Sequence, residues 1–329
     1  MNILIFGKDG QLGKAFHVLL DSLLPALVAK PNIQYVGRIE CDLTNEQAIT
    51  SLLSHFQPNL IINASAYTAV DKAETELDLA FAVNARSPEI MAQYAAQHGA
   101  TFLHYSTDYV FDGEKYGFYL EDDIRNPLGI YGKSKAAGEE AIAKAFLSST
   151  AKETAQYAIF RTSWVYGEGG NFIRTILRLA KEREDLKVIH DQFGVPTSAH
   201  WLAQVSLNLA VDDSIRLRRF ASGIYHAVPT GETTWFGLAS LAVQAALDAG
   251  ATLKANPGAI KPIQAVEYPL PAPRPMNSRM SSDKLRLALA RSEADHSNSY
   301  NEVARIIEFP GWEAMVREYV SKLARDKLI

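Results

Sequence analysis

The sequence predicts an α/β fold, in which a doubly wound parallel sheet is accompanied by a smaller C-terminal α/β domain. Short β-rich runs alternate with longer helical patterns through the first half of the chain, and this alternation is typical of a parallel sheet covered by helices. After Trp164 the alternation loosens. The length of 329 residues suits two domains of roughly 150 residues each.

The strands and helices of the first half follow from apolar runs and helical periodicity. Strands are expected at Ile3–Phe6, Ile33–Val36, Leu60–Asn63, Thr101–Tyr105 and Ala158–Arg161. Helices are expected at Lys14–Leu24, Glu46–Phe56, Asp71–Ala85, Ser87–His98 and Ser134–Ala145.

In the second half the pattern predicts fewer regular elements. Helices are expected at Asn171–Lys181 and Ala199–Val211, and after Ser282 and Pro310; strands are expected at Lys187–His190 and Gly223–Ala227. The proline-rich segment 268–275 predicts an extended loop. The polar run 292–300 is expected to be mobile, and no role is assigned to the polar segments 148–156 and 291–300.

Composition excludes several classes of function. The net charge is −4 with both signs mixed along the chain, which argues against a nucleic-acid partner. The single cysteine, Cys41, excludes an intrachain disulfide and a multi-cysteine zinc site, so we expect a reducing compartment, the cytoplasm. The first apolar run reads as a strand and not as a signal peptide, and the apolar stretch 235–253 contains Gln244 and Asp248, so no membrane partner is expected.

A glycine motif follows the first expected strand and opens a helix. Gly7 permits a tight turn, Gly10 lets the backbone approach a pyrophosphate, and Gly13 lets the helix pack on the strand. Gln11 and Leu12 of the same motif are expected to bind the cofactor, and the N-terminus of the helix that follows would supply N–H donors to the phosphates. The motif predicts a Rossmann-like dinucleotide-binding domain over 1–165, which parts of 187–211 and 270–280 rejoin, and an interleaved substrate-binding domain over 166–329. The alternative is a simple glycine-rich turn.

The end of the second strand bears on the choice of cofactor. An acid there favours the ribose 2′-hydroxyl of NADH, and an arginine favours the 2′-phosphate of NADPH. The sequence has Val36-Gly37-Arg38, so we expect NADPH, with NADH as the alternative, and with Arg38 and Lys8 near the phosphate. Arg38 could equally be a solvated loop charge. Asp42 and Leu43 are expected to contact the adenine.

Tyr131 and Lys135 are one helical turn apart, and Thr107 lies in the polar cluster Ser106-Thr107-Asp108, directly after the expected strand Thr101–Tyr105. A phenol has a pKa near 10, and a neighbouring ammonium is expected to lower it so that Tyr131 exchanges a proton near neutrality. Lys135 would also bind the nicotinamide ribose. With the glycine motif, these residues predict a hydride-transferring enzyme; the alternative for Tyr131 and Lys135 is a solvated helix face.

The residues resemble the extended short-chain dehydrogenase/reductase family and, more closely, its reductases of dTDP-linked 4-keto sugars. The matching stretches are 7–13, 63–74, 106–113, 131–135, 161–166, 191–197 and 274–278. The resemblance implies hydride transfer from NADPH to the C4 carbonyl of a dTDP-sugar, giving dTDP-L-rhamnose. In that reaction Tyr131 would protonate the oxygen and Thr107 would hold it.

The resemblance also implies further roles. It places Ser65, Ala66, Tyr67 and Tyr105 against the cofactor, and Asp108, Trp164, Gln192, Phe193 and Arg274 at the substrate. Arg274 would contact a diphosphate, because a guanidinium matches phosphate geometry. The purely structural alternatives are core packing for Trp164 and Phe193, a turn for Gln192 and an exposed loop for Arg274.

Some members of the family are described as dimers that hold magnesium through interface glutamates. Ala15 and His200 occupy those positions here, and neither suits Mg²⁺, so we expect no required metal and a monomer or weak homodimer.

Two other classes share these motifs. A nucleotide-sugar epimerase or dehydratase would use the same tyrosine and lysine, but a dehydratase would want Asp-Glu where this chain has Asp108-Tyr109. The regulatory subunit of methionine adenosyltransferase also resembles these reductases and is not catalytic. The presence of Thr107, Tyr131 and Lys135 favours catalysis.

Overall fold

The computed structural model describes residues 1–148, 154–294 and 308–329. Most of the polar run 292–300 lies outside these residues, as does the middle of segment 148–156. Residues 292–294 are the end of a helix.

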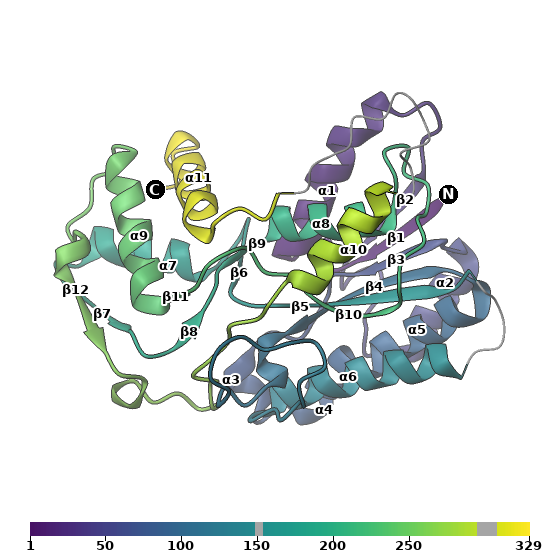
Figure 1. Cartoon of the computed structure of the whole chain (residues 1–329), viewed down its shortest axis with the longest axis horizontal. Coiled ribbons are helices and arrows are strands. Elements are labelled where there is room, and N and C mark those ends of the chain that lie inside the picture. The colour runs from purple at the N-terminus through teal and green to yellow at the C-terminus, as the bar shows by residue number, and fades with distance from the viewer. Residues whose placement is uncertain (149–153, 295–307) are drawn as a thin grey trace.

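Within the described residues, six strands form one parallel sheet in the order β10-β5-β4-β3-β1-β2 (Figure 1). The strands are β1 (Asn2–Phe6), β2 (Asn32–Val36), β3 (Leu60–Asn63), β4 (Thr101–Thr107), β5 (Gln156–Thr162) and β10 (Gly223–His226). The chain leaves β1 to form β2 on one side and returns to form β3 on the other. This reversal of strand order opens a crevice at the carboxyl ends of β1 and β3, where doubly wound folds bind ligands.

Helices cover both faces of the sheet (Figure 1). One face carries α1 (Gln11–Leu23), α8 (Ala199–Ala210) and α10 (Asp283–Ala294); the other carries α2 (Glu46–Phe56), α5 (Ser87–His98) and α6 (Ile130–Leu147). Strand β1 shows why its run is continuously apolar: Ile3 and Ile5 enter one core while Leu4 and Phe6 enter the other. The predicted doubly wound parallel sheet is confirmed.

A third core lies beside the sheet and contains α7, α9 and α11, seen at the left of Figure 1. These helices are α7 (Phe172–Glu182), α9 (Trp235–Asp248) and α11 (Trp312–Arg325). Short strand pairs accompany them: β7 (Leu186–Ile189) with β12 (Ile260–Ile263), β6 (Val165–Tyr166) with β9 (Thr197–Ser198), and β8 (Phe193–Gly194) with β11 (Thr233–Thr234). The sequence pattern did not predict α9 or β12.

The helix expected at Asp71–Ala85 is wrong in detail. The structure has α3 (Val70–Ala73), α4 (Leu77–Phe81) and a π-helical turn η2 (Ala82–Arg86) that leads into α5. The buried Asn84 of this turn accepts a hydrogen bond from Tyr67 N and donates to Tyr67 O, at 2.9 and 3.0 Å. Tertiary hydrogen bonds therefore take precedence here over regular helical periodicity.

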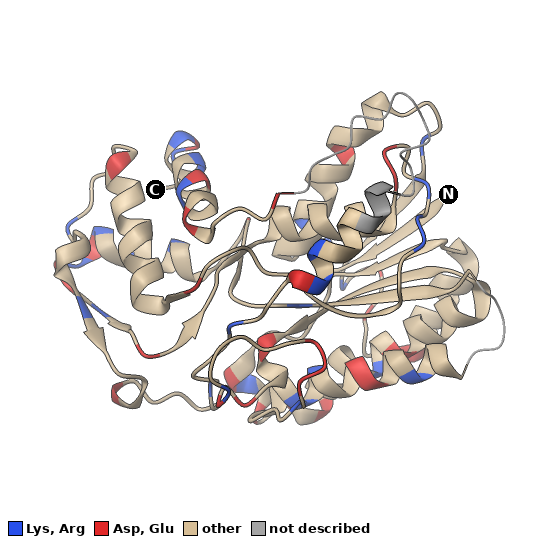
Figure 2. Cartoon of the chain, viewed as in Figure 1, with Lys and Arg blue, Asp and Glu red and all other residues tan. Residues whose placement is uncertain are grey.

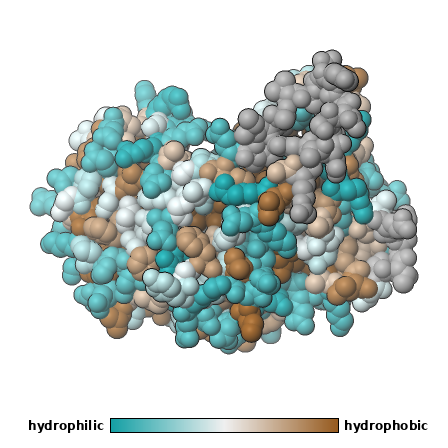
Figure 3. All heavy atoms as spheres, in the orientation of Figure 1, coloured by the Kyte–Doolittle hydropathy of each residue, from teal (hydrophilic) through white to brown (hydrophobic). Residues whose placement is uncertain are grey.

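Short 3₁₀ turns complete the fold: η1 (Leu24–Ala26), η3 (Asp108–Val110), η4 (Pro257–Ala259) and η5 (Ala265–Glu267). Figure 2 shows acidic and basic residues interspersed over the described parts of the chain. On the face shown in Figure 3, hydrophobic residues are scattered among hydrophilic ones. The structure contains, over its described ranges, no helix of the length and apolar character needed to cross a bilayer.

Candidate active site

A cavity of 1020 Å³ opens at the carboxyl edge of the sheet, over the crevice between β1 and β3. It brings together most of the residues that the sequence predicts for the site. The predicted residues that line it are Gly7, Gly10, Gln11, Leu12, Arg38, Asp42, Leu43, Ser65, Ala66, Tyr67, Tyr105, Thr107, Asp108, Tyr131, Lys135 and Trp164.

The glycine turn forms the floor at the end of β1. Gly7 has φ +87°, and a Cβ there would lie 2.7 Å from the backbone of Ala64 and Ser65. A Cβ on Gly13 would lie 2.0 Å from Gly7 O, so Gly13 supports the turn from behind the cavity wall. Gly10 is the N-cap of α1 and brings no side chain to cover the first N–H groups. The turn therefore fits a pyrophosphate at a helix N-terminus.

At the end of β2 the arrangement of charges differs from the expectation. Arg38 is 81% exposed, and its Nε lies 3.9 Å from Asp42 Oδ2. Lys8 forms an ion pair with Glu40, whose other oxygen accepts a hydrogen bond from Gly37 N at 2.9 Å. Glu40 is a carboxylate that the sequence analysis missed; its position four residues after Val36 was the available signal. Arg38 is thus the cation that lines this end of the cavity.

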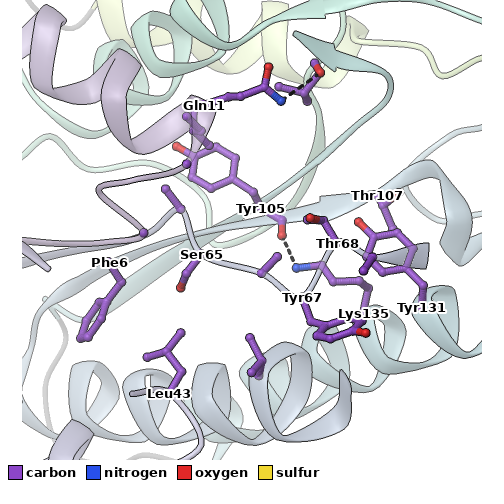
Figure 4. A pocket seen from close by; sticks show the side chains of 18 of the residues that line it. Phe6, Gln11, Leu43, Ser65, Tyr67, Thr68, Tyr105, Thr107, Tyr131 and Lys135 are labelled. Carbon is purple, nitrogen blue, oxygen red and sulfur yellow. Dashed lines mark hydrogen bonds between the residues drawn. The ribbon is translucent and has the colours of Figure 1, made fainter. Parts of the chain in front are cut away.

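Thr107, Tyr131 and Lys135 meet at the other end, where β4 and α6 face each other (Figure 4). Thr107 ends β4, and its hydroxyl donates to Asp108 Oδ1 at 2.9 Å. Helix α6 begins at Ile130, earlier than expected, so Tyr131 and Lys135 both lie on its first turns. Lys135 is buried and donates to Tyr105 O at 2.5 Å.

The expectation that Lys135 lowers the pKa of Tyr131 is wrong for this structure. Burial and the charge of Asp108 raise the pKa of Tyr131 to about 12, and a hydrogen bond with Thr107 opposes the rise. Burial lowers the pKa of Lys135 to about 8, against the influence of Glu139. Lys135 points at a backbone carbonyl, while Tyr131 stays protonated at neutral pH, which is the form that a proton donor needs.

Asp108 is the acidic group of the site and is 2% exposed. Burial raises its pKa to about 6, and hydrogen bonds from Ser278 and Thr107 oppose that rise. Ser278 belongs to the segment after the proline-rich loop, so residues far apart in the sequence meet at this carboxyl group. A carboxyl that titrates near neutrality inside a cavity is typical of functional sites.

Two tryptophans, Trp164 and Trp235, form part of the cavity wall. Trp164 adopts the left-handed region with φ +47°, and its ring stacks on Trp235 with ring centroids 3.7 Å apart. A Cβ on Gly194 would lie 2.7 Å from the Trp164 ring. Trp235 also lines the cavity and was not predicted. The sequence feature that could have indicated the start of α9 at Trp235 is the preceding Thr234, which caps the helix by accepting a hydrogen bond from Gly237 N.

Gln192, Phe193 and Arg274 are not among the described residues that line the cavity. Gln192 is buried, while Phe193 is partly exposed and lies 5.3 Å from the Arg279 guanidinium. Arg274 pairs with Asp71 at 2.8 Å and donates to Ala272 O at 2.6 Å. Their roles at the substrate stay predictions.

Comparison with known proteins gives relatives along almost the whole chain. The chain is 39% identical over 325 residues to a dTDP-4-dehydrorhamnose reductase of Escherichia coli K12, covering 98% of both sequences. A crystal structure of a dTDP-4-dehydrorhamnose reductase from Clostridium acetobutylicum superimposes with a TM-score of 0.78 and 31% identity, covering 98% of this chain and 99% of that one.

A second solved structure, the dTDP-4-dehydrorhamnose reductase of Bacillus anthracis in complex with NADP, gives a TM-score of 0.77 at 31% identity, with 98% and 99% of the two chains covered. The family model described as RmlD substrate binding domain matches residues 1–308. Together with the glycine turn and the Thr107, Tyr131 and Lys135 cluster, these matches show that the chain belongs to the RmlD substrate binding domain family.

Proposed function

We propose that the chain reduces the C4 keto group of dTDP-4-dehydro-β-L-rhamnose with NADPH, giving dTDP-β-L-rhamnose in the last step of dTDP-rhamnose synthesis. The observation that carries this proposal is one cavity in which a glycine turn at one end faces a protonated tyrosine at the other. The names of the relatives supply the substrate.

The residues of the chain divide the chemistry between them. NADPH, when bound, supplies the hydride that reaches the carbonyl carbon. Tyr131 donates its phenolic proton to the carbonyl oxygen, and Thr107 holds that oxygen by a hydrogen bond. Lys135 would bind the ribose of the nicotinamide. The high pKa of Tyr131 favours reduction, because the phenol is fully protonated before the hydride moves.

The two ends of the cavity set the specificity. Gly7, Gly10 and the start of α1 hold the pyrophosphate, while Arg38 contacts the 2′-phosphate and makes NADPH preferred over NADH. Asp42 and Leu43 contact the adenine, and Ser65, Ala66, Tyr67 and Tyr105 line the cofactor. These assignments are supported by their places in the wall.

At the sugar end, Asp108 contacts a sugar hydroxyl and Trp164 packs on the sugar ring, with Trp235 behind it. Gln192, Phe193 and Arg274 are assigned to the substrate from the family resemblance. We also propose a cytoplasmic monomer or weak homodimer, without nucleic-acid or membrane partners and without a required metal. The single cysteine supports the cytoplasmic location, and the mixed charges support the absence of a nucleic-acid partner.

The test is an assay of NADPH and of NADH oxidation with dTDP-4-dehydro-β-L-rhamnose made in situ by upstream enzymes. We expect one cofactor molecule oxidised per sugar, faster with NADPH, and dTDP-L-rhamnose as the isolated product. An epimerase would convert the sugar without net oxidation of added cofactor. Folded, cofactor-binding protein that oxidises neither cofactor would refute the proposal.

A further inference from the structure

A chain of buried polar side chains leads to Lys135 on the face of the sheet that packs against α6, and its members Asn63 and His104 are not used by the mechanism above. Asn63 ends β3, His104 lies in the middle of β4, and Lys135 faces them from α6. Their exposed fractions are 0%, 0% and 1%. His104 lies between the other two, with Nδ1 3.1 Å from Asn63 Nδ2 and Nε2 3.2 Å from Lys135 Nζ.

Hydrogen bonds around Asn63 determine which ring nitrogen of His104 carries the proton. Asn63 Oδ1 accepts from both the backbone N–H and the hydroxyl of Ser65, so the amide nitrogen is the group directed at His104. An amide nitrogen only donates, and His104 Nδ1 must therefore accept. Burial, together with the nearby charge of Lys135, holds the pKa of His104 well below its usual range, so the ring is neutral. Its one proton is then on Nε2.

This tautomer acts directly on Lys135. The Nε2–H group points at Nζ, and an ammonium group has only donors, so two donors face each other while Lys135 is charged. When Lys135 loses a proton, its lone pair accepts from His104 Nε2 while a remaining N–H keeps the bond to Tyr105 O. The ring thus stabilises the neutral amine.

The other groups that face Lys135 do not duplicate this effect. On β4, Tyr105 offers its carbonyl oxygen. On α6, the carboxylate of Glu139 favours the charged ammonium, but it is itself paired with Arg161 of β5 at 2.7 Å. His104 is the neighbour whose bonding pattern favours the amine.

We propose that His104 is a positioning residue of the reductase, which, held in one tautomer by Asn63, lets Lys135 give up a proton during turnover and so restore Tyr131. The protons balance: Tyr131 gives its proton to the substrate oxygen, Lys135 replaces it directly or through the ribose hydroxyl, and water of the cavity reprotonates Lys135. This inference rests on the proposed function, whereas the tautomer of His104 does not.

The first test is therefore independent of activity. Nitrogen-15 NMR of protein labelled at histidine reports which ring nitrogen carries the proton. The His104 signal is assigned by its loss in His104→Gln or, should His104→Gln not fold, by its shift in Asn63→Asp. We expect the Nε2–H tautomer across the neutral range. An Nδ1–H tautomer or a charged ring would overturn the inference, even in a fully active enzyme.

The second test uses the pH profile of kcat. In Asn63→Asp the carboxylate accepts from Nδ1–H of His104, so Nε2 becomes an acceptor and favours the charged form of Lys135. The basic limb of the pH profile should therefore move upward by about one pH unit or more. We expect kcat to be about tenfold lower and KM to stay within about twofold. His104→Gln should shift the limb in the same direction, because its amide oxygen can face the ammonium.

His226→Gln, at a buried histidine of β10 outside the cavity wall, is the matched control and should leave the limb in place. A limb unmoved in both Asn63→Asp and His104→Gln would overturn the role in turnover. A protein without reductase activity would instead refute the proposed function, and the tautomer measurement would still stand by itself.

Discussion

Burial keeps the phenol of Tyr131 protonated, with a pKa raised to about 12, and we propose that this residue donates the proton in the reduction. Tyr131→Phe removes the proton donor and little surface, so kcat should fall about 100- to 10,000-fold, the range of general acid catalysis, while NADPH binding stays unchanged. Stopped assays for kcat and a fluorescence titration for NADPH would measure the two effects. Turnover within a few-fold of the wild type would dismiss Tyr131 as the acid.

Asp108 is predicted to lower stability at neutral pH. Its pKa rises from 3.8 to about 6 on folding, and one pKa unit corresponds to about 1.4 kcal/mol, so its ionised form opposes folding by about 3 kcal/mol. Because the pKa of Asp108 is raised in the folded state, its protonated carboxyl does not oppose folding below pH 4. The free energy of unfolding should then fall as the pH rises from about 4 to about 6. Asp108→Asn should therefore be more stable than the wild type at pH 7.

Urea unfolding at pH 7 and pH 4 would measure this difference in free energy. We expect the extra stability of Asp108→Asn over the wild type to shrink as the pH falls. The variant should also be less active if Asp108 holds a sugar hydroxyl. Thr50→Ala, at an exposed position of α2, should show no comparable pH dependence. An equal advantage at both pH values would mean that the ionisation of Asp108 is not the cause.

The sequence predicted which residues lie together in the cavity but not their electrostatics. The motif spacing placed Thr107, Tyr131 and Lys135 correctly in one cavity. It could not show that Lys135 points at Tyr105 O, since a pKa depends on burial and on contacts with other elements. The Trp164 and Trp235 pair was likewise hidden, because its members are 71 positions apart and meet only through tertiary packing.

At the scale of elements, the π-helical turn η2 links the segment around Tyr67, the proposed cofactor loop, to helix α6. Asn84 bonds both backbone groups of Tyr67 and donates to Ser134 of α6 at 3.0 Å. Asn84→Ala should lower the free energy of unfolding by about 1–3 kcal/mol, because buried partners lose their bonds, and should raise the KM for NADPH several-fold. Urea unfolding and initial rates would measure both effects.

Asn256→Ala is the matched control, because Asn256 caps the exposed turn η4 far from the cavity wall. It should leave the KM for NADPH unchanged. A KM that stays the same in Asn84→Ala, despite the loss of stability, would show that η2 supports the fold and not the cofactor loop.

The strands and most helices of the sheet were predictable, since their buried runs are long and apolar; α2 and β3 match the expected bounds. The elements that were not predicted lack a clear local pattern. Helix α9 is apolar on several sides and shows weak periodicity, and β12 is a short strand that contains Pro262. The broken helix at 71–85 depends on the tertiary bonds of Asn84, which no local pattern contains.

At the scale of the whole molecule, segments distant in the sequence complete one site. Strand β10 extends the sheet beside β5, α8 and α10 cover its face, and Ser278 reaches Asp108. How the chain divides into a dinucleotide-binding and a substrate-binding domain stays a prediction. The expected return of parts of 187–211 and 270–280 to the first domain would be tested by limited proteolysis with and without NADPH.

The last prediction concerns assembly. Ala15 and His200 stand where some relatives are described as carrying magnesium-binding glutamates, and neither side chain offers the oxygen ligands that Mg²⁺ requires. Burial also lowers the pKa of His200, which keeps it neutral but does not make it a ligand for a hard cation. Activity and sedimentation coefficient should therefore be the same in EDTA and in Mg²⁺, and Ala15→Glu combined with His200→Glu should make the association metal-dependent. A wild-type dimer that EDTA disperses in analytical ultracentrifugation would show that other residues of the chain hold the metal.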